Sequence, residues 1–237
     1  MDYRKGQYHL VHQGDNLENI SQFYRVKPSE ILAYNPGLNP QHLTPDRYIL
    51  IPNEPPVRHA TAEEAHLVQP LLTQLLPFWP KPQRDKVDEF IQKFGLPQEV
   101  GMGQITWFNN GPWKRTTIHR HTVEHDSPTS HTDFVASTID YKVPTHYFGM
   151  LADFDGSLYP DRTAGEVTAK CDLEEMNFMA LNIMHDMVTG RKNVQQALDV
   201  AVEIEKAFRL HGQKPAYTQS LQFKPGTHTA DPGAQVF

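Results

Sequence analysis

Residues 8–52 have the sequence YHLVHQGDNLENISQFYRVKPSEILAYNPGLNPQHLTPDRYILIP, which holds the elements of one small folded unit in order. A β-prone run over residues 8–11 is ended by Gly14, and a second apolar run over residues 48–52 closes the segment. Because these runs stand at opposite ends of the segment, we expect them to pair as a two-stranded antiparallel sheet.

Two short helices are predicted between these strands. Leu17, Ile20 and Phe23 recur at helical spacing, which predicts a first helix with one buried face. We expect Asp15 to cap this helix, with Glu18 three residues on to complete a capping box.

The second helix is predicted to begin at Pro28, a residue that suits a first helical turn. Its apolar stripe ends at Tyr34, and the run Asn35-Pro36-Gly37 stops it. Two helices packed on one face of a two-stranded sheet are a workable minimum for so small a unit. The segment therefore predicts a βααβ module.

These features resemble the LysM domain, a family that binds glycans containing N-acetylglucosamine. The shared features are the Gly14-Asp15 turn with Leu17 and Ile20, the Asn35-Pro36-Gly37 helix stop, Leu38, Leu43 and the Ile51-Pro52 end. Two positions depart from the family: Asn16 stands where Thr or Ser is usual, and Asp46 where Gly is usual.

The resemblance implies a sugar groove between the loop after the first strand and the loop after the second helix. Carried over, the glycan-binding residues are Gly14, Asp15, Asn16 and Leu17 on one side, and Gly37, Leu38, Asn39, Pro40 and Leu43 on the other. Two alternatives stay open: apolar residues such as Leu17 and Leu43 with only a core role, and a LysM fold that serves as a docking adaptor without a glycan.

Composition excludes several functional classes. The net charge is −6 and no long basic run is present, so we expect no nucleic-acid partner and no adhesion to an anionic membrane. The apolar fraction of 38% suffices for a globular core, and the single cysteine, Cys171, allows no internal disulfide.

The first residues, MDYRKGQYHLV, lack the apolar core of a signal peptide, and no apolar run approaches the length of a membrane span. We therefore expect synthesis in the cytosol and a final place in the cell wall or on a spore surface. Three explanations are open: a processed or engineered start, deposition on a spore by the mother cell, and assembly within a phage tail or related device.

The rest of the chain is predicted to be a Pro-rich linker over residues 53–60, an α+β domain over residues 61–212 and an extended or poorly ordered tail over residues 213–237. The domain should hold an antiparallel sheet flanked by helices. We expect helices over residues 61–75 (capped by Thr61, interrupted at Pro70) and 87–94, a hairpin around Asn109-Asn110-Gly111, strands over 134–141, 147–151 and 165–170, and two last helices capped by Asp172 and Asn193.

The densest polar cluster, HRHTVEHDSPTSHTD over residues 119–133, contains the candidate metal ligands His119, His121, His125 and His131. Imidazole groups bind divalent transition metals at neutral pH, but this spacing matches no standard zinc pattern. The alternative is a solvated strand face followed by a polar loop.

Cys171 stands before a predicted helix, where a cysteine peptidase nucleophile would lie, with histidines downstream. The surrounding KCDLEE is acidic, which raises the pKa of a thiol and disfavours the thiolate. A buried, unreactive thiol is the competing interpretation.

We therefore expect a non-catalytic bacterial protein that binds peptidoglycan or another N-acetylglucosamine polymer through its LysM module. No cofactor is expected, apart from a divalent metal at the histidine cluster. The second domain would have a structural or interaction role, with protein partners or self-assembly. The alternative is a peptidoglycan-directed hydrolase, with either the histidine metal site or a Cys171 nucleophile in that domain.

Overall fold

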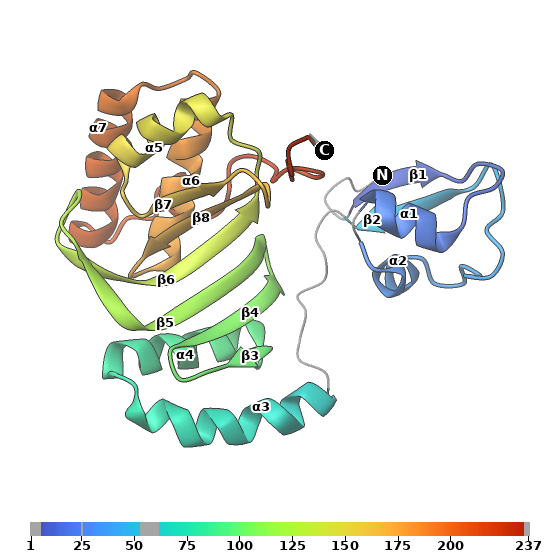
Figure 1. The fold of residues 1–237 in the computed structure, drawn as a ribbon, viewed down its shortest axis with the longest axis horizontal. Coiled ribbons are helices and arrows are strands. Elements are labelled where there is room, and N and C mark those ends of the chain that lie inside the picture. Colours follow the sequence, from blue (N-terminus) through green and yellow to red (C-terminus); the bar gives the residue numbers. More distant parts are fainter. Residues whose placement is uncertain (1–5, 25, 53–61, 235–237) are drawn as a thin grey trace. The chain divides into compact units, whose positions relative to one another are not determined.

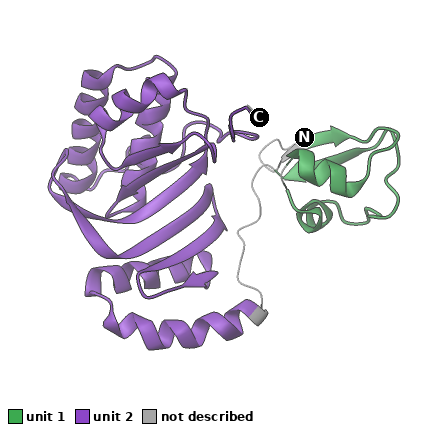
Figure 2. Ribbon diagram, in the orientation of Figure 1, with its two compact units in different colours: residues 1–58 green, residues 59–237 purple. Residues whose placement is uncertain are grey.

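The computed structural model of the chain describes residues 6–24, 26–52 and 62–234. The chain divides into two compact units, residues 1–58 and residues 59–237, which are called the first and the second unit below (Figure 2). The linker predicted over residues 53–60 and the cap predicted at Thr61 lie outside the described residues.

The first unit is the predicted βααβ module, with β1 (Gly6–Leu10), α1 (Leu17–Tyr24), α2 (Pro28–Tyr34) and β2 (Tyr48–Pro52) (Figure 1). The strands pair antiparallel from Gly6 opposite Pro52 to Leu10 opposite Tyr48. The core of this unit is formed by Val11, Leu17, Ile20, Val26, Ile31, Leu43, Ile49 and Ile51. So small a core buries little apolar surface, so hydrogen bonds that secure its loops carry more of its stability.

The elements of the second unit are α3 (Ala62–Leu75), η1 (Leu76–Phe78), α4 (Lys81–Phe94), β3 (Glu99–Val100), β4 (Gln104–Asn110), β5 (Trp113–His125), β6 (His131–Asp140), η2 (Thr145–Tyr147), α5 (Phe148–Phe154), β7 (Leu158–Asp161), β8 (Glu166–Cys171), α6 (Glu174–Val188), α7 (Val194–Glu205), η3 (Lys206–Leu210) and η4 (Ala216–Thr218). The strands form a six-stranded antiparallel sheet in the order β3-β4-β5-β6-β8-β7. The predicted α+β class with an antiparallel sheet and flanking helices is confirmed.

Helices pack near both edges of this sheet. Figure 1 shows α5 and α6 beside β6, β7 and β8, with α7 packed on these two helices, and α3 and α4 beside β3 and β4. None of the helices in the described part of the chain is long and apolar enough to cross a membrane.

One face of the sheet is packed against α6. The register sets Ile118 opposite Val135 and Val135 opposite Cys171, so these side chains share a face, called the helix-covered face below. From α6, the side-chain amide of Asn177 donates to the Val135 carbonyl over 2.9 Å and to Ser137 Oγ over 3.0 Å. This face carries the core of the second unit.

The predicted hairpin between β4 and β5 is confirmed, with φ of 50° at Asn109 and 70° at Gly111. The strand predicted over residues 147–151 is wrong, because this stretch forms part of η2 and α5. Its buried residues Leu151 and Phe154 are spaced by three, which suits a helix rather than a strand. The strands β3 and β7 were not predicted.

Two predictions about helix ends are corrected. Asp172 does not cap α6, whose N-cap is Leu173 without a side-chain hydrogen bond, because the Asp172 carboxylate binds Arg209 instead. Pro70 does not divide α3. Proline has no N–H to donate to the carbonyl one helical turn earlier, but Pro70 is exposed, so water can bind that carbonyl instead. The cap predicted at Asn193 is confirmed by its hydrogen bond from the Gln196 N–H.

The segment predicted as an extended tail has little regular structure as far as residue 234, but hydrogen bonds secure it to the second unit. The Asn182 side chain donates to the carbonyls of Tyr217 and Ser220 over 3.1 and 2.8 Å. Phe223 stacks on the His185 ring at a centroid distance of 4.3 Å. Residues 216–223 therefore belong to the packing around α6.

Candidate functional site

The loop that follows β1 and the loop that precedes β2 meet the sheet of the first unit at the same end. Leu10, the last residue of β1, lies opposite Tyr48, the first residue of β2. Backbone hydrogen bonds of 2.9 Å from the Val11 N–H to the Arg47 carbonyl, and from the Asp46 N–H to the Val11 carbonyl, continue the pairing beyond the strands. The loop after β1 and the loop before β2 are therefore neighbours.

The first of these loops is held by Asp15. Its carboxylate accepts the His12 N–H over 2.7 Å and lies 3.0 Å from His9 Nε2. The His12 N–H, followed by His9, lowers the pKa of Asp15 below its usual value. Gly14 precedes it with φ of 95°, a conformation that favours glycine.

The cap predicted at Asp15 is corrected by the structure. Asn16 Oδ1 accepts the Asn19 N–H over 2.8 Å, so Asn16 caps α1. Glu18 accepts a hydrogen bond from the Gln22 side chain rather than completing a capping box. Asp15 is not available for the cap because its carboxylate is already bound by the loop.

Replacement of Asn16 with alanine should therefore destabilise the first unit by about 0.5–2 kcal/mol, the usual cost of a lost N-cap. The measurement is hydrogen exchange of the α1 amides, followed by NMR. Asn16→Ser is the matched control, since serine keeps a cap oxygen and should cost much less. Equal exchange rates in the two variants would contradict the capping role.

The second loop is anchored by the side chain of Asn35. Its amide nitrogen donates to the carbonyls of Ile31 and Leu50, each over 2.7 Å, and its amide oxygen accepts the Leu50 N–H over 2.8 Å. The side chain thus pairs with Leu50 as a neighbouring strand would, and it joins the end of α2 to β2. The sequence predicted Asn35 only as a helix stop.

The nine predicted glycan-binding residues differ in how much of their surface is exposed to solvent. Leu17 and Leu43 are core residues, with 5% and 8% of their surface exposed, and Leu38 is partly buried against the same core. Asp15 is partly buried, and the remaining predicted residues are exposed: Gly14, Asn16, Gly37, Asn39 and Pro40.

A hollow of about 430 Å³ lies beside the second loop. It includes Gly37, Leu38 and Asn39 from the predicted set, together with the exposed rings of Tyr8 and Tyr48 on the outer face of the sheet. The residues predicted from the first loop do not line it. The second loop thus borders both the first loop and an aromatic surface.

The structure separates the four histidines predicted as metal ligands. His119 follows Ile118 on β5, so its side chain lies on the sheet face opposite the helix-covered one, where burial and Lys170 lower its pKa. The register between β5 and β6 shifts between Ile118 and Val123, and His121 lies exposed in that irregular stretch. Neither histidine belongs to the metal-binding groups found among the described residues.

His125 and His131, by contrast, are brought together. They are opposite each other in the pairing of β5 with β6, and their ring centroids are 4.9 Å apart. Asp133, two residues along β6 from His131, lies between them with only 1% of its surface exposed. The polar cluster predicted over residues 119–133 includes Asp133, and the structure places it on β6, where the alternation of a strand sets it on the same face as His131.

Cys171 lies next to this histidine cluster, with its Sγ 3.2 Å from His131 Nε2 and 3.3 Å from Asp172 Oδ1. Burial, followed by the charge of Asp172, raises the pKa of the Cys171 thiol well above its usual value. A catalytic thiolate requires a lowered pKa, so these surroundings favour the neutral thiol.

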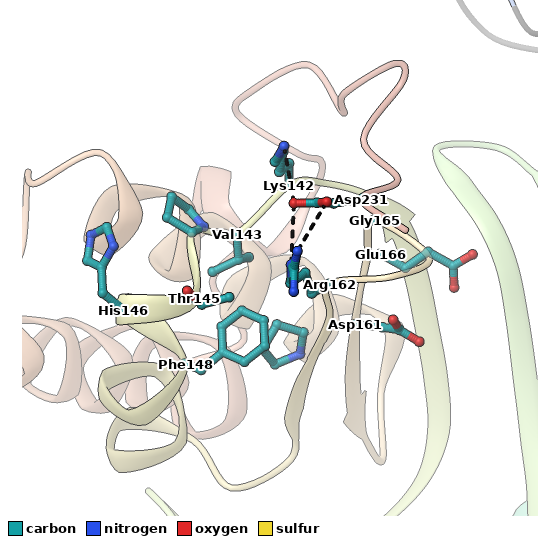
Figure 3. A pocket seen from close by; sticks show the side chains of 12 residues that line it. Lys142, Val143, Thr145, His146, Phe148, Asp161, Arg162, Gly165, Glu166 and Asp231 are labelled. Carbon is teal, nitrogen blue, oxygen red and sulfur yellow. Dashed lines mark hydrogen bonds and ion pairs between the residues drawn. The ribbon is translucent and has the colours of Figure 1, made fainter. Parts of the chain in front are cut away.

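A hollow of about 360 Å³ lies elsewhere in the second unit, beside residues 142–148 and β7 (Figure 3). The Asp231 carboxylate borders it, 3.3 Å from the Arg162 guanidinium and 3.6 Å from Lys142 Nζ. Arg162 contributes most to a lowered pKa of Asp231. None of the predicted site residues lines this hollow.

Comparison with known proteins bears on the first unit. Residues 9–52 match the family model described as LysM domain. Searches of the curated proteins and of the solved structures found no match for the chain. The resemblance stated for residues 8–52 is confirmed.

Proposed function

We propose that the chain, whose residues 9–52 are a LysM domain, binds peptidoglycan through the neighbouring loops of that domain. LysM domains bind glycans that contain N-acetylglucosamine, which supports this proposal. The observation that carries it is the continued pairing of Val11 with Asp46 and Arg47, because this pairing sets the two loops side by side.

In this proposal, the backbone groups of the two loops make most of the hydrogen bonds to the sugar. Exposed N–H and C=O groups around Gly14 and Gly37 are suited to the acetamido group and the ring hydroxyls of the sugar. Leu17 and Leu43 are core residues, so the partly buried Leu38 is the better apolar contact for the acetyl methyl group. Since each hydrogen bond adds about 1 kcal/mol net, a single LysM domain should bind weakly.

In this proposal the protein is a non-catalytic component of a bacterial cell wall or spore surface. Its LysM domain holds the second unit near the glycan and raises the local concentration of that unit. The second unit then makes structural or protein–protein contacts.

Sedimentation with purified peptidoglycan tests the glycan claim. The full chain should be found in the pellet, whereas a chain without residues 1–60 should stay in the supernatant. Equal sedimentation of both proteins would refute binding through the LysM domain. Zymography on cell walls tests the non-catalytic claim, and a clearing zone would refute it.

Point variants test the loop. Asn39→Ala should weaken binding about fivefold, because the side chain would lose one neutral hydrogen bond to the sugar of about 1 kcal/mol. Ser29→Ala is the matched control, because Ser29 is exposed at the other end of α2. Titration of chito-oligosaccharides, followed by NMR, measures both, and equal affinities would exclude the Asn39 side chain from the groove.

A further inference from the structure

Three metal-binding side chains meet on the helix-covered face of the second unit. His131 Nε2 lies 3.2 Å from Asp133 Oδ1, and His125 Nδ1 lies 3.4 Å from Asp133 Oδ2. One donor atom from each residue is within 4.8 Å of the other two. The side chains are 18%, 5% and 1% exposed for His125, His131 and Asp133, so the cluster is largely withdrawn from water.

Two atoms of this cluster lack a hydrogen-bond partner among the described residues. They are His125 Nδ1 and Asp133 Oδ1, and both are buried. A buried polar atom without a partner is costly, and each such atom in a native protein calls for an explanation. A bound cation would satisfy both atoms at once.

His131 also has the outer hydrogen bond that is typical of a metal ligand. His131 Nδ1 lies 2.7 Å from the Thr129 carbonyl, which can only accept, so Nδ1 carries a hydrogen, and Nε2 is the ring nitrogen that faces Asp133 Oδ1 and Cys171 Sγ. Histidines bound to metals typically donate their other N–H to a carbonyl or carboxylate in this way. The far nitrogen of His125 lies 3.9 Å from Asp155 Oδ1, and Ser157 Oγ donates to Asp133 Oδ2.

We propose that His125 Nδ1, His131 Nε2 and the Asp133 carboxylate bind one divalent transition-metal ion of the Zn²⁺ class. Imidazole and carboxylate ligands suit such ions. Ligand bonds of about 2.0–2.2 Å in a tetrahedral arrangement set neighbouring donor atoms about 3.3–3.6 Å apart. The distances from Asp133 to His131 and to His125, 3.2 and 3.4 Å, are close to this range. Three protein ligands leave a fourth position for water.

A second group of candidate ligands, His131 with Cys171 and Asp172, is less suited to the ion. Asp172 is already bound by two nitrogens of Arg209, at 2.6 and 2.9 Å. With Asp172 engaged in this way, the group has only His131 and Cys171 left as ligands. The ion is therefore assigned to His125, His131 and Asp133.

The competing cation is a proton on His131 Nε2. A proton would satisfy Asp133 Oδ1 but would leave His125 Nδ1 without a partner. A metal ion would contact all three side chains.

The test is titration of Zn²⁺ into metal-stripped full-length protein at neutral pH, measured by calorimetry. Loss of an outer partner alone lowers metal affinity about 10–100-fold, so loss of a ligand should lower it at least about 100-fold. Asp133→Asn and His125→Ala are the two ligand variants. The first keeps the shape of the buried side chain, and the second changes a residue that is partly exposed.

Two control variants replace histidines that lie outside the cluster. His121→Ala should bind Zn²⁺ as the wild type does, because His121 is exposed in the irregular stretch of β5. His12→Ala disrupts the separate group of His9, His12 and Asp15 in the first unit and should leave the assigned binding event intact. Zn²⁺ should also raise the unfolding temperature of the wild-type second unit, followed by tryptophan fluorescence, but not that of His125→Ala.

Wild-type affinity in both ligand variants would overturn the proposal. So would the absence of Zn²⁺ binding by the stripped wild-type protein, or a binding event that disappears in His12→Ala. If Asp133→Asn fails to fold, His125→Ala alone decides the question by the same titration.

Discussion

Replacement of Trp107 with alanine is expected to destabilise the second unit by about 3–5 kcal/mol, the range for removal of a large core aromatic. Trp107 is 0% exposed, and its ring centroid lies 5.6 Å from that of Phe90 on α4. Its indole N–H donates to the Gly95 carbonyl over 2.9 Å. The substitution therefore leaves a cavity between α4 and β4 and removes the donor from a carbonyl at the end of α4.

Urea unfolding followed by tryptophan fluorescence measures this effect. All tryptophans, namely Trp79, Trp107 and Trp113, belong to the second unit, so the signal reports that unit alone. Phe78→Ala is the control, because Phe78 is 69% exposed and its loss should change stability by less than about 0.5 kcal/mol. Equal midpoints for the two variants would contradict the packing of α4 against the sheet.

Asp186→Ala should destabilise the second unit by about 1.5–3 kcal/mol, the range for hydrogen bonds to a charged group, because it removes the carboxylate that Lys192 and Tyr217 share. The Asp186 side chain is 4% exposed and lies 2.5 Å from Lys192 Nζ and 3.4 Å from Arg191 Nη1. It also accepts the Tyr217 hydroxyl hydrogen over 2.7 Å, which links α6 to the C-terminal segment. Without the carboxylate, Lys192 and the Tyr217 hydroxyl lose their acceptor.

The same urea titration measures this variant. Asp153→Ala is its control, since Asp153 is an exposed carboxylate on α5. Burial and the hydrogen bond to Asp186 raise the pKa of Tyr217 to about 12, so a spectroscopic titration should show a lower value in Asp186→Ala. If Asp186→Ala proved as stable as Asp153→Ala, the contacts of Asp186 would contribute no net free energy to the stability of the second unit.

The stabilisation by Asp186 should also depend on pH. Burial raises the pKa of this carboxyl, but the hydrogen bonds from Lys192 and Tyr217 outweigh it and lower the pKa below 3.8. A carboxyl with a lowered folded-state pKa stabilises the protein above its ordinary pKa, and that stabilisation is lost as the pH falls through the folded-state pKa. The stability difference between wild type and Asp186→Asn should therefore be full at neutral pH and shrink in acid below the ordinary value.

The sequence predicted the first unit well because its signals are local. Helical spacing of Leu17 and Ile20, the Pro28 start and the glycine at position 37 each act within a few residues, and all agree with the βααβ order. The cap was wrong because Asp15 and Asn16 are both good capping residues, and only tertiary contacts with His9 decide between them.

The cluster of His125, His131 and Asp133 could be predicted only in part, because the register between β5 and β6 decides which histidines it includes. His125 and His131 are near in sequence, but the pairing of β6 with β8 is needed to bring Cys171 beside them. The irregular stretch of β5 has no sequence signal, so His119 and His121 seemed equally good candidates. Asp133 was the more telling residue, since a carboxylate two positions from a histidine shares its strand face.

The outermost strands of the six-stranded sheet have a consequence for the behaviour of the protein at high concentration. β3 has only two residues, and β7 has four, one of which is Pro160. Proline has no amide hydrogen to donate, and short edge strands offer few N–H and C=O groups with which a strand of another chain could pair. Edge-to-edge pairing of this sheet with another chain is therefore disfavoured, which leaves side-chain surfaces as the expected contacts between copies of the second unit.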